Sequence, residues 1–164
     1  MSSAIIYTID GGDRSGALVP DRVEYRLPDG YMLPVLTQDG FCRTCSSLRG
    51  VELIYDLDTE SCLYTNEDRL AVRALKRGNP NYDRAYVAMR RYEWRQARQS
   101  DPRCVICGSQ DVFMLVGKRC SDPVTGHTFE SVDCEFYTSD VLSWTILDTE
   151  GNVLERDIGI FGKL

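Results

Sequence analysis

Cys42-Arg43-Thr44-Cys45 and Cys104-Val105-Ile106-Cys107 are two short stretches in which two residues separate a pair of cysteines. This spacing lets a tight turn direct both sulfurs at one point, which supplies half of a tetrahedral metal site. Gly108 follows the second pair, where such a turn usually needs a residue that tolerates a positive φ angle. The two stretches together predict one structural Zn²⁺ ion with four ligands: Cys42, Cys45, Cys104 and Cys107.

The paired cysteine turns resemble the knuckles of zinc-ribbon domains, which sit at the tips of β-hairpins. The resemblance covers Phe41–Ser47 and Arg103–Val116. It implies a metal site but no particular function, because zinc ribbons occur in nucleic-acid binders, enzymes and adaptors. The spacer from Ser46 to Arg103 is longer than the roughly 15–20 residues of a compact module. We therefore expect an insertion between the knuckles, with zinc holding its two ends together.

Other interpretations of the cysteines stay open. An iron–sulfur cluster accepts the same four thiolates, a single Cys-x-x-Cys pair can be a redox dithiol, and cysteines can simply pack in a core. A second metal site is also conceivable, although the spacing of its candidate ligands is not typical of a metal turn. These candidates are Cys62, Cys120, His127 and Cys134.

Cysteine usage and the N-terminal sequence favour a cytoplasmic protein. The chain has seven cysteines, an odd number, whereas a secreted disulfide framework normally has an even one. Residues 1–6 lack the basic start and sustained apolar stretch of a secretory signal. No apolar run approaches the roughly 20 residues that span a bilayer, so we expect no membrane association.

The hydrophobic pattern predicts one domain over residues 1–164, of α+β class. Its antiparallel β-rich scaffold carries the zinc-ribbon-like four-cysteine site and an inserted helical pair. Apolar residues at helical spacing predict one helix from Asn66 to about Gly78 and a second from about Pro80 to Arg98. The expected strands are Ala4–Ile9, Arg22–Leu27, Tyr31–Leu36, Val51–Leu57, Val112–Val116, Thr128–Phe136, Leu142–Leu147 and Val153–Ile158.

Charge is unevenly distributed along this acidic chain, whose net charge is −6. Residues 66–100 hold nine basic side chains and four acidic ones, so the helical insertion is basic and the remainder is strongly acidic. A basic helical face can bind phosphates or an acidic partner, and a tryptophan can stack on a base. Solvent or the acidic part of the same chain can equally balance these charges. The candidate binding residues are Arg73, Arg77, Arg84, Arg91, Trp94, Arg95 and Arg98.

Two functions follow, and both are non-enzymatic. The first is a zinc-stabilised protein-interaction module, of the inhibitor, immunity or adaptor type, that binds a protein partner. The second is a nucleic-acid-binding regulatory protein that uses the basic face of residues 66–100. An enzyme ranks third, because it would need acids such as Asp56 and Asp58 to bind a catalytic metal. We expect the zinc to be structural in every case.

Overall fold

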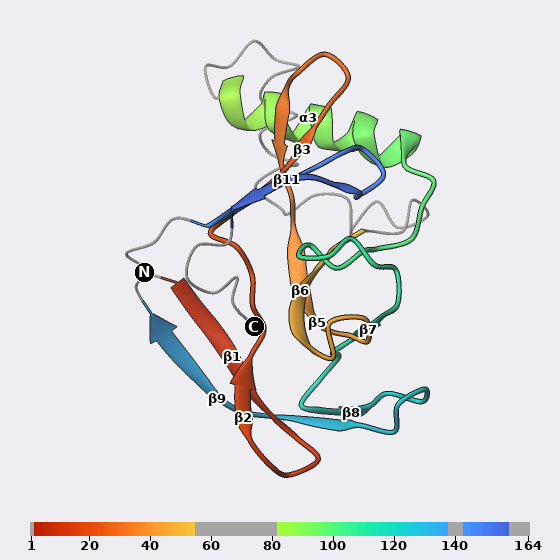
Figure 1. Cartoon of the computed structure of the whole chain (residues 1–164). Helices are drawn as coiled ribbons and strands as arrows, with labels where there is room; N and C mark the ends of the chain where they lie inside the picture. The colour runs from red at the N-terminus through yellow and green to blue at the C-terminus, as the bar shows by residue number, and fades with distance from the viewer. Residues whose placement is uncertain (1, 55–81, 138–142, 158–164) are drawn as a thin grey trace.

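Three β-sheets and one helix form the described part of the chain, residues 2–54, 82–137 and 143–157 (Figure 1). The structure is a computed structural model of the full sequence. The helix lies at one end of the molecule and the first sheet at the opposite end. Within the described residues, no helix is long and apolar enough to cross a membrane.

Sheet I contains both the N-terminal strand and the longest strand that the structure describes. Its strand order is β2-β1-β9-β8. β1 pairs antiparallel with β9 along its whole length, with a register shift between Ile6 and Tyr7. β2 covers only part of the other edge of β1, from Ile6 to Thr8. The strands are β1 (Ser2–Ile9), β2 (Arg14–Gly16), β8 (Arg119–Ser121) and β9 (Thr128–Tyr137).

Sheet II joins two hairpins, and its order is β11-β10-β3-β4. Both hairpins are predicted from their turn residues. Gly30 takes a φ of 86° between β3 and β4, and Gly151 takes 80° between β10 and β11. β3 and β10 pair in parallel, which unites the hairpins in one sheet. The strands are β3 (Arg22–Arg26), β4 (Met32–Pro34), β10 (Trp144–Leu147) and β11 (Val153–Asp157).

Sheet III has the order β6-β5-β7 and carries the first cysteine pair at the tip of its hairpin. β5 spans Thr37–Cys42, β6 spans Ser47–Glu52, and β7 spans Val112–Met114. Two glycines let neighbouring residues pack closely against this hairpin. A Cβ atom on Gly40 would lie 2.5 Å from Val51 Cγ2, and one on Gly50 would lie 2.8 Å from Val19 Cγ2.

Helix α3 (Tyr82–Ala97) covers sheet II with its apolar side. Trp94 stacks on Tyr25 of β3 with ring centroids 4.4 Å apart, and its Nε1 donates a hydrogen bond to the carbonyl oxygen of Thr149 (3.0 Å). Ala88, on the same helix, has no exposed surface. The helix agrees with the predicted second helix within two residues at its N-terminal end and one at its C-terminal end.

The buried side chains form two clusters. The larger one combines residues of sheet II with Trp94 of α3, and it includes the metal-site candidates Cys42 and Cys104. The smaller one joins sheet I to sheet III through Tyr7, Phe41, Leu48 and Phe129. Sheet III therefore lies between the other two sheets and contributes to both cores.

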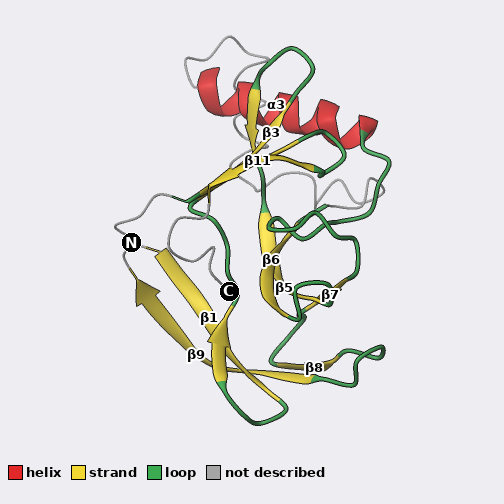
Figure 2. Ribbon diagram, in the orientation of Figure 1, coloured by secondary structure: helices red, strands yellow, loops and turns green. Residues whose placement is uncertain are grey.

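The predicted α+β class with an inserted helical pair is wrong. The described residues form three sheets and a single helix of 16 residues. Figure 2 shows that strands dominate the described secondary structure. The physical reason is that strands supply most of the buried side chains, whereas α3 covers only part of sheet II. The predicted helix from Asn66 lies outside the described residues, as do the acids Asp56 and Asp58.

Candidate metal centre and binding groove

The first cysteine pair sits on the β5–β6 hairpin. Cys42 is the last residue of β5, and Cys45 lies in the turn that leads to β6. The N–H of Cys45 donates a hydrogen bond to Cys42 Sγ (3.4 Å). Ser46 follows Cys45 as Gly108 follows Cys107, and it takes a φ of 53°. The first turn therefore contains the residue with a positive φ that such a turn needs. Because Ser46 carries a side chain, this conformation costs a small amount of strain energy.

The second pair is held against sheet III by backbone contacts. Cys104 forms an isolated antiparallel bridge with Val51, and its N–H donates to the carbonyl oxygen of Ser109 (2.9 Å). Gly108 has a φ of 75°, as predicted, and its N–H closes the turn on the carbonyl oxygen of Cys104 (2.8 Å). The chain between the two cysteine pairs therefore ends beside β6, the strand that follows the first pair.

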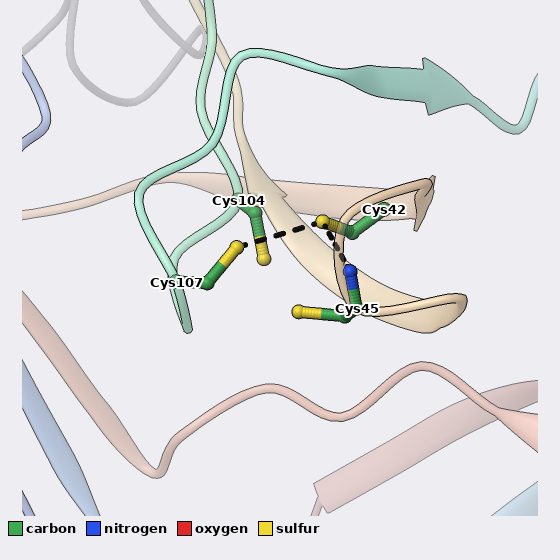
Figure 3. Close-up of side chains that lie close together, drawn as sticks. All are labelled: Cys42, Cys45, Cys104 and Cys107. Atoms are coloured by element: carbon green, nitrogen blue, oxygen red, sulfur yellow. Dashed lines mark hydrogen bonds between the residues drawn. The ribbon is translucent and has the colours of Figure 1, made fainter.

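The four cysteines converge, as Figure 3 shows. All four Sγ atoms lie within 4.8 Å of one another, and those of Cys42 and Cys107 are 3.6 Å apart. A tetrahedral site with metal–sulfur bonds of about 2.3 Å needs sulfurs about 3.8 Å apart, so a small contraction would complete it. Cys42 and Cys104 are buried, Cys45 is half-buried, and Cys107 is exposed. The four residues fit a metal ion.

Burial makes two of these thiols poor acids when no cation is near. It raises the pKa of Cys104 well above its usual value and that of Cys107 to about 11. Burial also acts on Cys45, but hydrogen bonds with Cys107, Cys42 and Arg49 bring its pKa below the usual value. A divalent cation would displace the thiol protons and offset the charge of the thiolates.

Arg49 is the basic residue that contacts the cluster, and the sequence patterns do not reveal it. It lies in β6 and is almost fully buried, and its positive charge beside Cys45 helps to lower the pKa of that thiol. Arg43 and Arg103, which lie next to the cysteines in the sequence, have other partners. Arg43 binds Asp111 and Asp122, and Arg103 donates to the carbonyl oxygens of Gly108 and Glu150.

A bidentate ion pair connects the first knuckle to sheet I. Arg43 donates to both carboxylate oxygens of Asp122, at 2.6 and 2.8 Å. Asp122 has no exposed surface and also accepts hydrogen bonds from the Val124 N–H and the Thr125 hydroxyl. Arg43 holds the pKa of this carboxyl well below its usual range. The knuckle is therefore connected to the β8–β9 turn as well as to its own sheet.

A second buried pair connects the other knuckle to the helix. Glu52 and Arg98 have side chains with no exposed surface, and they form two hydrogen bonds of 2.8 and 2.9 Å. The carboxylate of Glu52 also accepts from the Tyr25 hydroxyl (2.5 Å) and the Arg103 N–H (2.8 Å). Arg103 immediately precedes Cys104, so this network positions the second cysteine pair relative to α3.

The described members of the predicted binding set, Arg91, Trp94, Arg95 and Arg98, do not share one exposed face. Trp94 and Arg98 are buried, Trp94 in the core against Tyr25 and Arg98 against Glu52. Arg91 and Arg95 lie half-buried on α3. The side chain of Arg84 and all of Arg73 and Arg77 lie outside the described residues. Trp94 is therefore not positioned to stack on a base.

Of the four residues considered for a second metal site, the three that the structure describes do not lie together. The cluster at Cys42 is the one group of metal-ligating side chains found among the described residues. His127 instead contacts Asp10 through Nδ1 (2.7 Å). Cys120 lies half-buried in β8, and Cys134 is exposed on β9. Cys62 lies outside the described residues.

An open groove of about 950 Å³ lies between sheets I and II and is also lined by the start of β5 in sheet III. Its apolar lining includes Ile5, Ala17, Val19, Val23 and Val35. Four ionisable residues also line it, three of them acidic: Asp21, Arg22, Glu24 and Asp39. Burial raises the pKa of Asp39, which accepts a hydrogen bond from the Tyr7 hydroxyl (3.0 Å). The sequence gives no sign of this groove, because its walls come from distant segments.

The chain matches no known protein family, no curated protein and no solved structure. What it does must therefore be inferred from the geometry of the cysteine cluster and the groove.

Proposed function

We propose that this chain is a zinc-stabilised protein-interaction module that acts by binding a partner rather than by catalysis. The observation that supports it most is the convergence of four cysteine sulfurs within 4.8 Å, from segments that are far apart in the sequence. One ion at this point would hold together sheet III, the start of the 104–107 turn and, through the Glu52 network, helix α3. The ion would thereby fix the scaffold that displays the groove.

Zinc is the metal that the donor set favours. All four ligands are thiolates, and closed four-thiolate sites are typical of structural Zn²⁺. A closed site leaves no open position for a substrate, which supports a structural role. Iron is the alternative that four cysteines also accept. Metal analysis of the purified protein decides between them: we expect one zinc per chain and no visible absorption, whereas a coloured, iron-containing protein would contradict zinc.

The groove between sheets I and II is the proposed docking site, and an extended segment with basic side chains is its proposed occupant. Its ionisable lining is mainly acidic, and the half-buried carboxylate of Asp39 would be stabilised by a lysine or arginine. The net charge of −6 adds a longer-range attraction for a basic partner. Apolar side chains of the same segment would pack against Ile5 and Val35.

The edge of β1 offers backbone hydrogen bonds to such a segment. β2 pairs with Ile6–Thr8 only, so no described residue pairs with the Ser2–Ile5 half of that edge. Ala4 and Ile5, which belong to this half, also line the groove. A strand edge that no described residue pairs, next to a groove with both apolar and acidic lining, fits the arrangement that binds peptides by strand addition.

The test uses zinc-loaded protein and a library of seven-residue peptides in which apolar residues alternate with lysine or arginine. We expect binding that shifts the NMR signals of Ala4, Ile5 and Val35, and that weakens roughly tenfold or more in Ile5→Arg. Leu154→Arg is the matched control, because Leu154 is similarly exposed (48% against 44%) but lies on β11 outside the groove. Absence of peptide binding, or equal loss in both variants, would contradict the groove.

A parallel titration against generic DNA and RNA at low salt tests the nucleic-acid alternative. That alternative predicts affinity that falls steeply with salt and is lost in Arg91→Glu/Arg95→Glu. Nucleic-acid binding of this kind, together with an inert groove, would replace the proposal with the alternative function.

A further inference from the structure

The four cysteines differ sharply in their access to solvent. Cys107 is exposed at the tip of the second turn, whereas Cys42 and Cys104 have no exposed surface and Cys45 is half-buried. Of these four residues, Cys107 is therefore the one that small oxidants in solution can reach most easily. A cysteine thiolate that binds a metal at the protein surface can also act as a nucleophile toward molecules in solution.

Cys107 has a neighbouring sulfur from the opposite turn. Its Sγ lies 3.6 Å from that of Cys42, and Figure 3 marks this contact. A disulfide needs about 2.05 Å, so the two sulfurs must approach each other by roughly 1.5 Å. Cys107 belongs to a surface turn, whereas Cys42 ends a strand in the core. Movement of the Cys107 side chain can supply most of this approach.

We propose that Cys107 is an oxidation site for peroxides, and that Cys42 is the residue that resolves the oxidised sulfur into a disulfide. This inference rests on the proposed metal binding by the four cysteines. It is independent of the groove and of its partner.

The chemistry is balanced in two steps. The Cys107 thiolate attacks one oxygen of hydrogen peroxide, the O–O bond breaks, and one proton is taken up. The products are a sulfenic acid on Cys107 and one water. The Cys42 thiolate then attacks the Cys107 sulfur, forms the S–S bond and expels hydroxide, which takes a proton to become water. The two thiolates lose two electrons in total, and the peroxide gains them.

The product would lose the metal but keep the two turns joined. Only Cys45 and Cys104 remain as thiols in the cluster, and two ligands are too few for a closed tetrahedral site. The new bond links positions 65 residues apart in the sequence, across the same gap that the ion would close. The covalent bond therefore replaces the metal as the connection between the knuckles, and the oxidised protein stays folded.

The experiment uses full-length zinc-loaded protein in which Cys62, Cys120 and Cys134 are replaced by serine. Zinc content is measured first, so that a protein without metal is recognised as a failure of the metal site itself. Hydrogen peroxide is then added in small molar excess. A chromogenic chelator follows zinc release, and peptide mass spectrometry identifies the disulfide.

We expect one zinc released per Cys42–Cys107 disulfide, retention of the far-ultraviolet circular dichroism spectrum, and recovery of zinc binding after reduction. Cys107→His is the informative variant, because three cysteines and one histidine also bind zinc. It should release zinc at least about tenfold more slowly than the parent, since its exposed ligand has no thiolate.

Cys45→His is the matched control, and it should release zinc at the parent rate because Cys42 and Cys107 remain. Two results would overturn the proposal. One is a dominant disulfide between any other pair of cysteines. The other is release from Cys107→His as fast as from the parent protein.

Discussion

Glu52 is a carboxylate whose side chain has no exposed surface, and Arg98 is its bidentate partner. Removing the guanidinium would leave a buried charge with only the Tyr25 hydroxyl and the Arg103 N–H to stabilise it. We expect Arg98→Met to lower the free energy of unfolding by about 3–5 kcal/mol. Urea denaturation of the zinc-loaded protein measures this change.

Arg14→Met is the control for that substitution, because Arg14 forms its ion pair with Asp133 in solvent, with about half of each side chain exposed (54% and 52%). It should cost less than about 1 kcal/mol. Equal costs for the two arginines would show that the Glu52–Arg98 pair contributes no more than a surface pair.

Gly151 is a second residue whose replacement should be severe. It has a φ of 80°, and a Cβ atom there would lie 2.5 Å from Glu52 Oε2 and 2.8 Å from an Arg98 nitrogen. Gly151→Ala should therefore cost the strain of a positive φ, about 1–2 kcal/mol, plus the displacement of the buried pair. The total should exceed about 3 kcal/mol in thermal or urea unfolding.

Gly117→Ala separates the two contributions to the Gly151 result. Gly117 has a φ of 75°, but nothing lies within 4 Å of a Cβ atom at that position. Gly117→Ala should therefore lower the free energy of unfolding only by the strain of the positive φ. A Gly151→Ala variant that is no less stable than Gly117→Ala would mean that the Glu52 carboxylate moves aside freely.

The same residues show where sequence patterns identify a site and where they do not. The four cysteines were predictable, because the two-residue spacing is itself the geometric requirement of a metal turn. The role of Arg98 was not predictable. The sequence grouped it with the outward-facing arginines of the helix, whereas the side chain turns inward to a strand residue 46 positions earlier. Helical periodicity carries no information about such a distant partner.

At the scale of elements, turn chemistry explains which parts of the fold could be predicted. The β3–β4 and β10–β11 hairpins follow from turns with glycine at a positive φ, and both are confirmed. Two three-residue strands, β2 and β8, are too short to show an alternating pattern. β5 contains Asp39-Gly40, which is typical of a turn, and only its packing against Val51 explains the glycine there. The second helix was predicted because it is long and amphipathic.

Asp122 connects two such elements, the first cysteine turn and the β8–β9 turn. It has no exposed surface, and Arg43 keeps its pKa below the usual value, so the native state favours the ionised form. We expect Asp122→Asn to lose about 1–3 kcal/mol of unfolding free energy at pH 7, because the neutral amide cannot form the bidentate pair.

The pH dependence of that loss has a definite sign. A carboxyl whose pKa is depressed in the folded state adds stability above its unfolded pKa of about 4, and this contribution disappears as the pH falls below that value. The difference between wild type and Asp122→Asn should therefore be constant from pH 7 to about pH 5 and shrink below about pH 4. Acid removes a bound metal from both proteins alike, so their difference isolates Asp122. A difference that grows in acid would contradict the ion-pair interpretation.

At the scale of the whole molecule, the cysteine cluster belongs to the larger of the two cores, and its two turns are connected to sheet I by Asp122 and to α3 by Glu52. Loss of zinc should therefore destabilise the entire fold rather than one loop. With zinc at a thousand times its dissociation constant, linkage predicts about 4 kcal/mol of stabilisation, equivalent to roughly 8–16 °C in melting temperature. Differential scanning calorimetry with and without a strong chelator measures the shift.

Cys104→Ser tests whether that shift comes from this site. Cys104 is one of the four proposed ligands, so its serine variant should bind zinc weakly and melt close to the chelated wild-type protein. Its side chain is also buried, and its backbone is bridged to Val51. Its melting temperature should no longer respond to zinc. Cys134→Ser, at an exposed position on β9, should behave like wild type in both respects. A wild-type protein that keeps its full melting temperature after complete zinc removal would mean that the sheets are stable on their own packing and that the cluster has another role.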